Sequence, residues 1–220
     1  MRMSPRRTTA YTLRLPDGAD ADRVTELLQR YDPYARRRRR AIKLAGAGTG
    51  TTLRLRGEEL VVPPADDVLA RALRHHLGGS WLVPPPAPGE HQEPLEDLVR
   101  VFVPHKLLPA ELATLLRPML PGVAIREDPK LDLFWFEDED SELTISAWVV
   151  RDRAVLPLAA SALRDIESLY EVGIDDVQGP TPLTAEETWR IVELLERELG
   201  GLSIDRYGFQ LTGPADLIPR

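Results

Sequence analysis

Alternating apolar and polar residues, followed by apolar residues at three- and four-residue spacing, occur twice along this chain. The two segments span 13–33 and 101–121, a constant offset of 88 residues (101 minus 13), and Pro16 falls on Pro104. A period of two predicts a strand and a period near 3.6 predicts an amphipathic helix. Each segment therefore predicts a strand, a proline turn and a short helix.

A second pair of matching segments predicts a further helix in each half. Residues 69–79 align with 191–201 at an offset of 122 (191 minus 69), with leucine or isoleucine at four-residue spacing in both. Both helices run into a glycine pair, Gly78–Gly79 and Gly200–Gly201. Glycine favours the left-handed conformation that commonly ends a helix. An apolar strand is predicted directly after each pair.

Between the helices of each half, the pattern predicts three strands. They are expected near 38–44, 51–56 and 59–62 in the first half, and near 123–127, 131–137 and 143–150 in the second. The second half is 34 residues longer (122 minus 88), and we place this insertion near 151–183, as one helix and a loop rich in glycine and proline.

This order of elements predicts an α+β protein made of two tandem ferredoxin-like (βαββαβ-type) units, with the helices on one sheet face only. The first unit is expected over 8–84 and the second over 97–212. Residues 85–96 form a proline-rich linker between them.

The two halves of the chain carry net charges of opposite sign. Residues 1–90 contain 16 Lys/Arg and 10 Asp/Glu, a net charge of +6, whereas residues 91–220 contain 12 and 25, a net charge of −13, and the two add to −7. An asymmetry of this size indicates two halves that attract each other or two surfaces for different partners.

If helices cover one face of each sheet, the period-two pattern assigns residues to the other face. In the first unit this face is predicted to be basic across three strands, with the binding residues Arg14, Arg37, Arg39, Lys43, Arg54 and Arg56. Such a face suits phosphate or an acidic protein. Two other interpretations remain: arginines at a sheet edge that prevent aggregation, or a face that meets the acidic second unit.

Aromatic residues of the second unit are predicted on its first and third strands, at Phe102 and at 134–136. Such aromatics stack bases in RNA-binding sheets, but an acidic run that repels phosphate follows them. This predicted hairpin turn is a candidate site for a basic partner and contains Glu137, Asp138, Glu139, Asp140 and Glu142.

Catalytic and metal-binding signatures are weak in this sequence. It has no cysteine, and His75 and His76 are adjacent, so on a helix they point about 100° apart and do not share a metal. His105 is a possible acid–base group without a visible partner. The glycine-rich 46–51 lacks the Lys-Ser/Thr of a phosphate loop. We therefore expect no cofactor and no metal, and leave enzymatic activity open, leaning to none.

Two function classes follow from these patterns. The first is a non-enzymatic protein-binding module, such as an immunity protein, an antitoxin or a regulatory subunit, whose acidic second unit contacts a basic protein. The alternative is a nucleic-acid-binding or RNA-processing protein that uses the basic face of the first unit. No apolar run approaches the roughly 20 residues that span a bilayer, so we expect no membrane partner and a cytoplasmic location.

Overall fold

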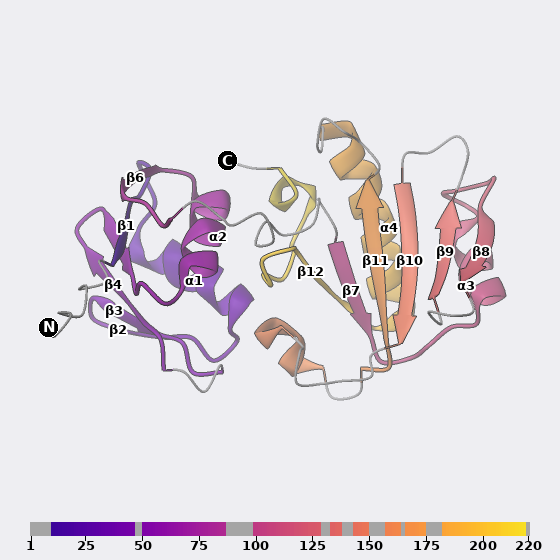
Figure 1. Cartoon of the computed structure of the whole chain (residues 1–220), viewed down its shortest axis with the longest axis horizontal. Helices are drawn as coiled ribbons and strands as arrows, with labels where there is room; N and C mark the ends of the chain where they lie inside the picture. Colours follow the sequence, from indigo (N-terminus) through magenta and orange to yellow (C-terminus); the bar gives the residue numbers. More distant parts are fainter. Residues whose placement is uncertain are drawn as a thin grey trace, which may run out of the picture. The chain divides into compact units, whose positions relative to one another are not determined.

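The computed structural model describes residues 10–46, 50–86, 99–128, 133–137, 143–149, 157–163, 166–174 and 182–218. The chain forms two compact units (Figure 1), with the described residues up to Pro86 in the first and those from Val99 in the second. The described parts contain two antiparallel six-stranded sheets and four α-helices, which confirms the predicted α+β class. Most of the predicted linker lies outside the described residues.

The first unit alternates strands with two helices. Its elements are β1 (Tyr11–Arg14), α1 (Ala21–Tyr31), β2 (Arg36–Arg38), β3 (Ala41–Lys43), β4 (Thr52–Arg56), β5 (Glu59–Val62), α2 (Asp67–Leu77) and β6 (Ser80–Val83).

The second unit repeats this order, with longer elements except for its first helix and its last strand, and adds two 3₁₀ helices. They are β7 (Val99–Val103), α3 (Pro109–Leu116), β8 (Ala124–Asp128), β9 (Leu133–Glu137), β10 (Leu143–Val149), the 3₁₀ helix η2 (Leu158–Ala162), β11 (Ser168–Ile174), α4 (Pro182–Leu199), β12 (Leu202–Ile204) and the 3₁₀ helix η3 (Pro214–Asp216).

The two sheets have the same topology. The strand order is β2-β3-β4-β5-β1-β6 in the first unit and β8-β9-β10-β11-β7-β12 in the second, when both are read from the same edge. Each strand of one unit therefore has a counterpart at the same place in the other. In both units the first strand lies between the last strand and the strand that precedes the second helix.

Alternation along the strands of the first unit decides which side chains meet the helices. Leu13, Leu53 and Leu60 are fully buried, and α1 and α2 bury leucines of their own against them. The two helices lie on the same side of this sheet (Figure 1). Helix α1 begins after Asp20, whose side chain accepts hydrogen bonds from the amides of residues 22 and 23, as an N-cap aspartate commonly does.

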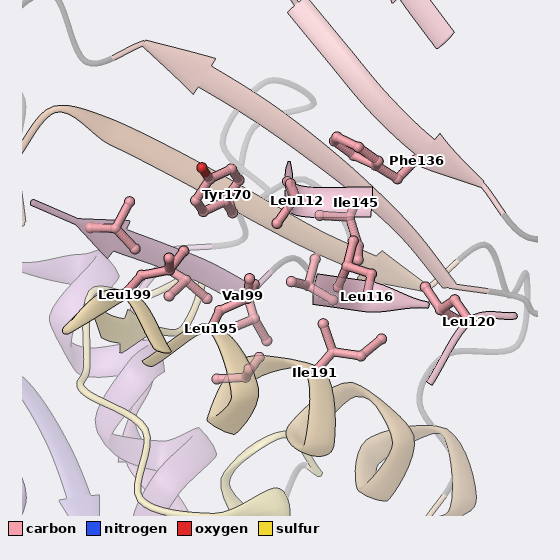
Figure 2. Close-up of a cluster of buried hydrophobic side chains, with 14 of the residues drawn as sticks. Val99, Leu112, Leu116, Leu120, Phe136, Ile145, Tyr170, Ile191, Leu195 and Leu199 are labelled. Carbon is pink, nitrogen blue, oxygen red and sulfur yellow. The ribbon is translucent and has the colours of Figure 1, made fainter. Parts of the chain in front are cut away.

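The core of the second unit lies between its sheet and α3 and α4. Figure 2 shows Leu195 and Ile191 of α4 below the sheet residues Ile145 and Tyr170, all of them buried. Ile191 and Leu195 come from one face of α4, at the four-residue spacing that places them in line on a helix.

A close backbone approach is repeated in both units at the second glycine of the predicted pairs. A Cβ on Gly79 would lie 2.2 Å from the carbonyl oxygen of Arg14, and a Cβ on Gly201 would lie 2.9 Å from that of Phe102. Arg14 and Phe102 are related by the offset of 88 and the glycines by the offset of 122. The two offsets, found in separate segments, therefore relate one and the same backbone contact in the two units. Glycine is required at this contact because any side chain would collide with the strand.

Two predictions about the elements are wrong. The strand expected near 38–44 is a hairpin, β2 and β3, joined by a turn at Arg39 and Arg40. The segment 151–183, expected as an inserted helix and loop, contains β11, which pairs with β10 and β7 inside the sheet. The only helix described within 151–181 is the 3₁₀ helix η2.

Within the described residues, no helix is long and apolar enough to cross a membrane.

Candidate anion-binding face of the first unit

The sheet of the first unit has one face toward the helices and an outer face away from them. Along β4, Leu53 and Leu55 are buried while Arg54 and Arg56 are exposed. Arg14 is exposed on β1, on the same side, because its register partner Glu59 is also the partner of Arg56. Residues that are directly opposite each other in antiparallel strands share a face.

The outer strands extend this surface. Lys43 on β3 is exposed and pairs with Arg36 of β2, while Arg38 pairs with Ala41 and through it with Arg54. The outer face therefore carries six cations, which we call the basic face: Arg14, Arg36, Arg38, Lys43, Arg54 and Arg56.

Two of the predicted binding residues do not lie on this face. Arg37 is the register partner of the buried Ile42, so it lies on the helix side, where its guanidinium forms an ion pair with Asp22 of α1. Arg39 lies in the β2–β3 turn with a φ of 55°. Arg36 and Arg38 were not among the predicted binding residues, because a run of five arginines has no apolar alternation to show which of them face outward.

Among the described residues, none of the six cations of the basic face forms an ion pair. Glu59 is the one acidic residue that the register places among them, between Arg14 and Arg56. Like charges gathered on one exposed surface repel one another, and an anion placed on that surface relieves the repulsion.

The outer face of the second unit differs because a chain segment covers part of it. Phe102 of β7 and Ile204 of β12 are buried there by Ala159, Ala160 and Ile166, which belong to η2 and the residues before β11. Leu169 and Leu202, the register partners of Phe102, pack against the same cluster. In the first unit β4 and β5 are joined by a tight turn at Gly57 and Glu58, and Arg14, at the position of Phe102, is exposed.

The shared topology allows a comparison of the basic face position by position. In the order Arg14, Arg36, Arg38, Lys43, Arg54 and Arg56, the second unit has Phe102, Ala124, Arg126, Glu137, Ser146 and Trp148. Only one of the six counterparts is a cation. The basic face is therefore a property of the first unit and not of the fold.

The other predicted site, the acidic turn, falls outside most of the description. Glu137 is the last residue of β9, and Asp138, Glu139, Asp140 and Glu142 lie outside the described residues. The aromatics beside it are divided between the two faces. Phe136 is fully buried in the core, and Trp135 lies on the outer face opposite Ser146.

The histidines of the described residues do not gather into a metal-binding group. His75 and His76 lie in the last turn of α2 with their rings edge to face, 5.0 Å apart. The described residues contain no group of three or more His, Asp or Glu that could hold a metal ion. His105 is exposed in the connection between β7 and α3.

No protein-family model matches the chain, and no curated protein or solved structure matches it significantly.

Proposed function

We propose that this protein is a non-enzymatic binding protein whose first unit binds the phosphate backbone of a nucleic acid. The observation that supports this best is the basic face, six exposed cations on one sheet face without ion pairs among the described residues.

The chemistry of the face favours contact with phosphates over contact with bases. The register places no aromatic side chain on the outer face of β1–β6, and Trp81 is the partner of the inward Leu13. Without aromatic stacking, affinity comes from arginine–phosphate pairs and from counterions released by the nucleic acid. We therefore expect binding that depends strongly on salt and weakly on sequence.

Fluorescence anisotropy with labelled single-stranded and duplex 20-mers tests this proposal. If all six cations contact phosphates, the slope of log K against log salt is about −4 to −5, and affinity falls by about 10²–10³ between 50 and 200 mM salt. Arg14→Glu combined with Arg54→Glu should abolish binding.

The matched control is Arg23→Glu with Arg74→Glu, which changes the net charge equally but at exposed positions of α1 and α2. This variant should retain most of the affinity. No binding at 50 mM salt, or an equal loss in both double variants, would contradict the proposal.

A second candidate function is the binding of a basic protein by the second unit. It is supported by the net charge of −13 over residues 91–220 and by the exposed Glu186, Glu187 and Glu193 of α4. An immunity, antitoxin or regulatory role would use such a surface. Cross-linking in host extract at low salt tests it: a basic protein should be captured by the natural protein and lost when these three glutamates become glutamine.

We also propose that both units are ferredoxin-like folds that arose by duplication. The order β6-β1-β5-β4 in the first unit and β12-β7-β11-β10 in the second is the order that such a fold requires, with a two-stranded extension at one edge. The repeated glycine contact supports a common origin.

A further inference from the structure

The six cations of the basic face are not spread evenly over the outer side of the sheet. Strand pairing arranges the outward residues in rows that cross the strands. The cations occupy three successive rows, as the pairs Arg36 and Lys43, Arg38 and Arg54, and Arg56 and Arg14. From the first row to the third they move from the edge strand β2 to β1, the fifth strand of the sheet. They therefore form an oblique band across the sheet.

Register and strand order give the dimensions of this band. Neighbouring strands lie about 4.8 Å apart, and a strand rises about 3.4 Å per residue. Arg36 and Arg14 are four strand intervals apart across the sheet and four residues apart along the strands, because Arg36 is level with Thr52 and Arg14 with Arg56. Their Cα atoms therefore lie about 23 Å apart. No row has more than two cations, so the band is narrow as well as long.

The outward positions on one side of the band carry no charge. Thr52 of β4, Val61 of β5 and Thr12 of β1 are half-buried there, and Val83 of β6 continues them. On its other side the band ends at the β2–β3 turn. The outer face is thus divided obliquely into a cationic part and an uncharged part.

This division distinguishes three kinds of phosphate ligand. A single nucleotide would meet few of the cations, because Arg36 and Lys43 are the only two that lie directly opposite each other. A duplex has a second backbone, separated from the first by a groove about 6 or 12 Å wide. With one backbone on the band, the second would lie over the uncharged positions or beyond the β2–β3 turn. A single strand has only one backbone, and its sugars and bases suit an uncharged surface.

We propose that the basic face binds a single strand of nucleic acid, with its phosphates along the band and its sugars and bases over Thr52, Val61 and Thr12. This inference rests on the proposed function and adds to it the form of the nucleic acid and the size of the site. The band has the length of about four extended nucleotides and six cations, so the site holds about four to six nucleotides, near the lower end of single-strand site sizes.

A preference for the single strand is informative because general electrostatic attraction predicts the opposite. A duplex carries one charge per about 1.7 Å of its axis, against about 3.4 Å for each of its strands. A cationic surface without a defined arrangement would therefore bind the duplex more tightly. Preference for the single strand requires a surface on which only one backbone finds cations.

Fluorescence anisotropy at 100 mM salt tests this inference on the full chain. A labelled thymidylate 20-mer should bind at least about fivefold more tightly than its duplex with the complementary adenylate strand. Among shorter thymidylates, affinity should rise at least about tenfold from two to six nucleotides, and then only in proportion to the number of overlapping positions. No binding of either form would contradict the proposed function itself. Equal or tighter binding of the duplex, or affinity that levels off at the dinucleotide, would overturn this inference and leave the proposed function in place.

A matched pair of variants tests the uncharged part of the face. Thr12→Lys adds a cation where a second backbone would lie, and Val68→Lys adds the same charge at an exposed position of α2. Thr12→Lys should raise duplex affinity about threefold more than Val68→Lys does, and so reduce the preference for the single strand. Thr52→Lys makes the same test if Thr12→Lys lowers the melting temperature. Equal changes in duplex affinity on both sides of the sheet would overturn the inference.

Discussion

Five of the six cations on the basic face of the first unit have an uncharged or acidic counterpart in the second, and Arg38 with Arg126 is the only pair that keeps the charge. The inward positions behave differently. Leu13 corresponds to Val101, Ile42 to Phe136 and Leu53 to Ile145, all of them buried.

This difference separates the residues that specify the fold from those that specify the partner. Inward rows stay apolar in both units because each sheet must bury that face against its helices. Outward rows have no such requirement. In the first unit they carry charge, and in the second they carry Phe102, Leu169 and Leu202, which a covering segment buries.

The largest loss of stability is expected at the glycine contact that occurs in both units. Gly79→Ala places a methyl group against the Arg14 carbonyl at a φ of 94°, and we expect a loss of about 4 kcal/mol or more in the free energy of unfolding. Gly201→Ala, whose nearest contact is less severe, should cost about 1–3 kcal/mol. Urea denaturation followed by circular dichroism measures both. A loss below 1 kcal/mol for Gly79→Ala would show that the two backbones are farther apart.

The covered and uncovered outer faces can be compared at one matched position. Phe102→Ala removes a ring that is 3% exposed and should cost about 3 kcal/mol in unfolding free energy. Arg14→Ala, at the equivalent position of the first unit, should change stability by less than about 0.5 kcal/mol. Equal costs in thermal denaturation would mean that the covering segment does not protect Phe102.

The end of the first helix is held differently in the two units. Asp32 is fully buried, and its carboxylate accepts hydrogen bonds from the amides of Tyr34, Ala45 and Gly46, at 2.9, 2.7 and 2.9 Å. Its counterpart at the offset of 88 is the apolar Leu120, 4% exposed. Asp32→Ala leaves three amides without an acceptor and should cost about 2 kcal/mol.

Hydrogen exchange separates these two modes of anchoring. Asp32→Ala should accelerate exchange at the amides of Ala45 and Gly46, because their acceptor is removed. Leu120→Ala should reduce the stability of the second unit through a cavity and leave those two amides unchanged. Unchanged exchange in the Asp32 variant would exclude the carboxylate as their partner.

The smallest expected effect tests function at the position where both units have arginine. Arg38→Glu should weaken nucleic-acid binding about fivefold at 100 mM salt and reduce the salt slope by about 0.7–0.9. Arg126→Glu makes the same change in net charge on the second unit and should leave affinity within about twofold. Anisotropy titrations of both variants decide the matter, and equal losses would assign the effect to net charge alone.

Much of the fold could be predicted from the sequence. The offsets of 88 and 122 located the first strand and both helices of each unit, because apolar periodicity there reflects burial on one side only. Four predicted members of the basic face, Arg14, Lys43, Arg54 and Arg56, also lie outward in the structure. Each alternates with a buried leucine or isoleucine, which makes its phase readable.

Strand β11 was missed because it contacts neighbours on both faces. Leu169 packs under the covering segment while Tyr170 and Val172 point to the helices, so its pattern lacks clean alternation. Strand β2 has the opposite problem, since all three of its residues are arginine. Its phase is fixed only by pairing with β3, which places Ile42 opposite Arg37.

By itself the sequence determined two helix-backed sheets, an uneven distribution of charge and the outward phase of the arginines that alternate with leucine or isoleucine. Only the tertiary structure decided that the two sheets share one strand order, that one outer face is covered, and that the six cations of the basic face form one oblique band. Periodicity reports whether a side chain is buried, whereas the neighbours of that side chain depend on strand pairing between residues far apart in the chain.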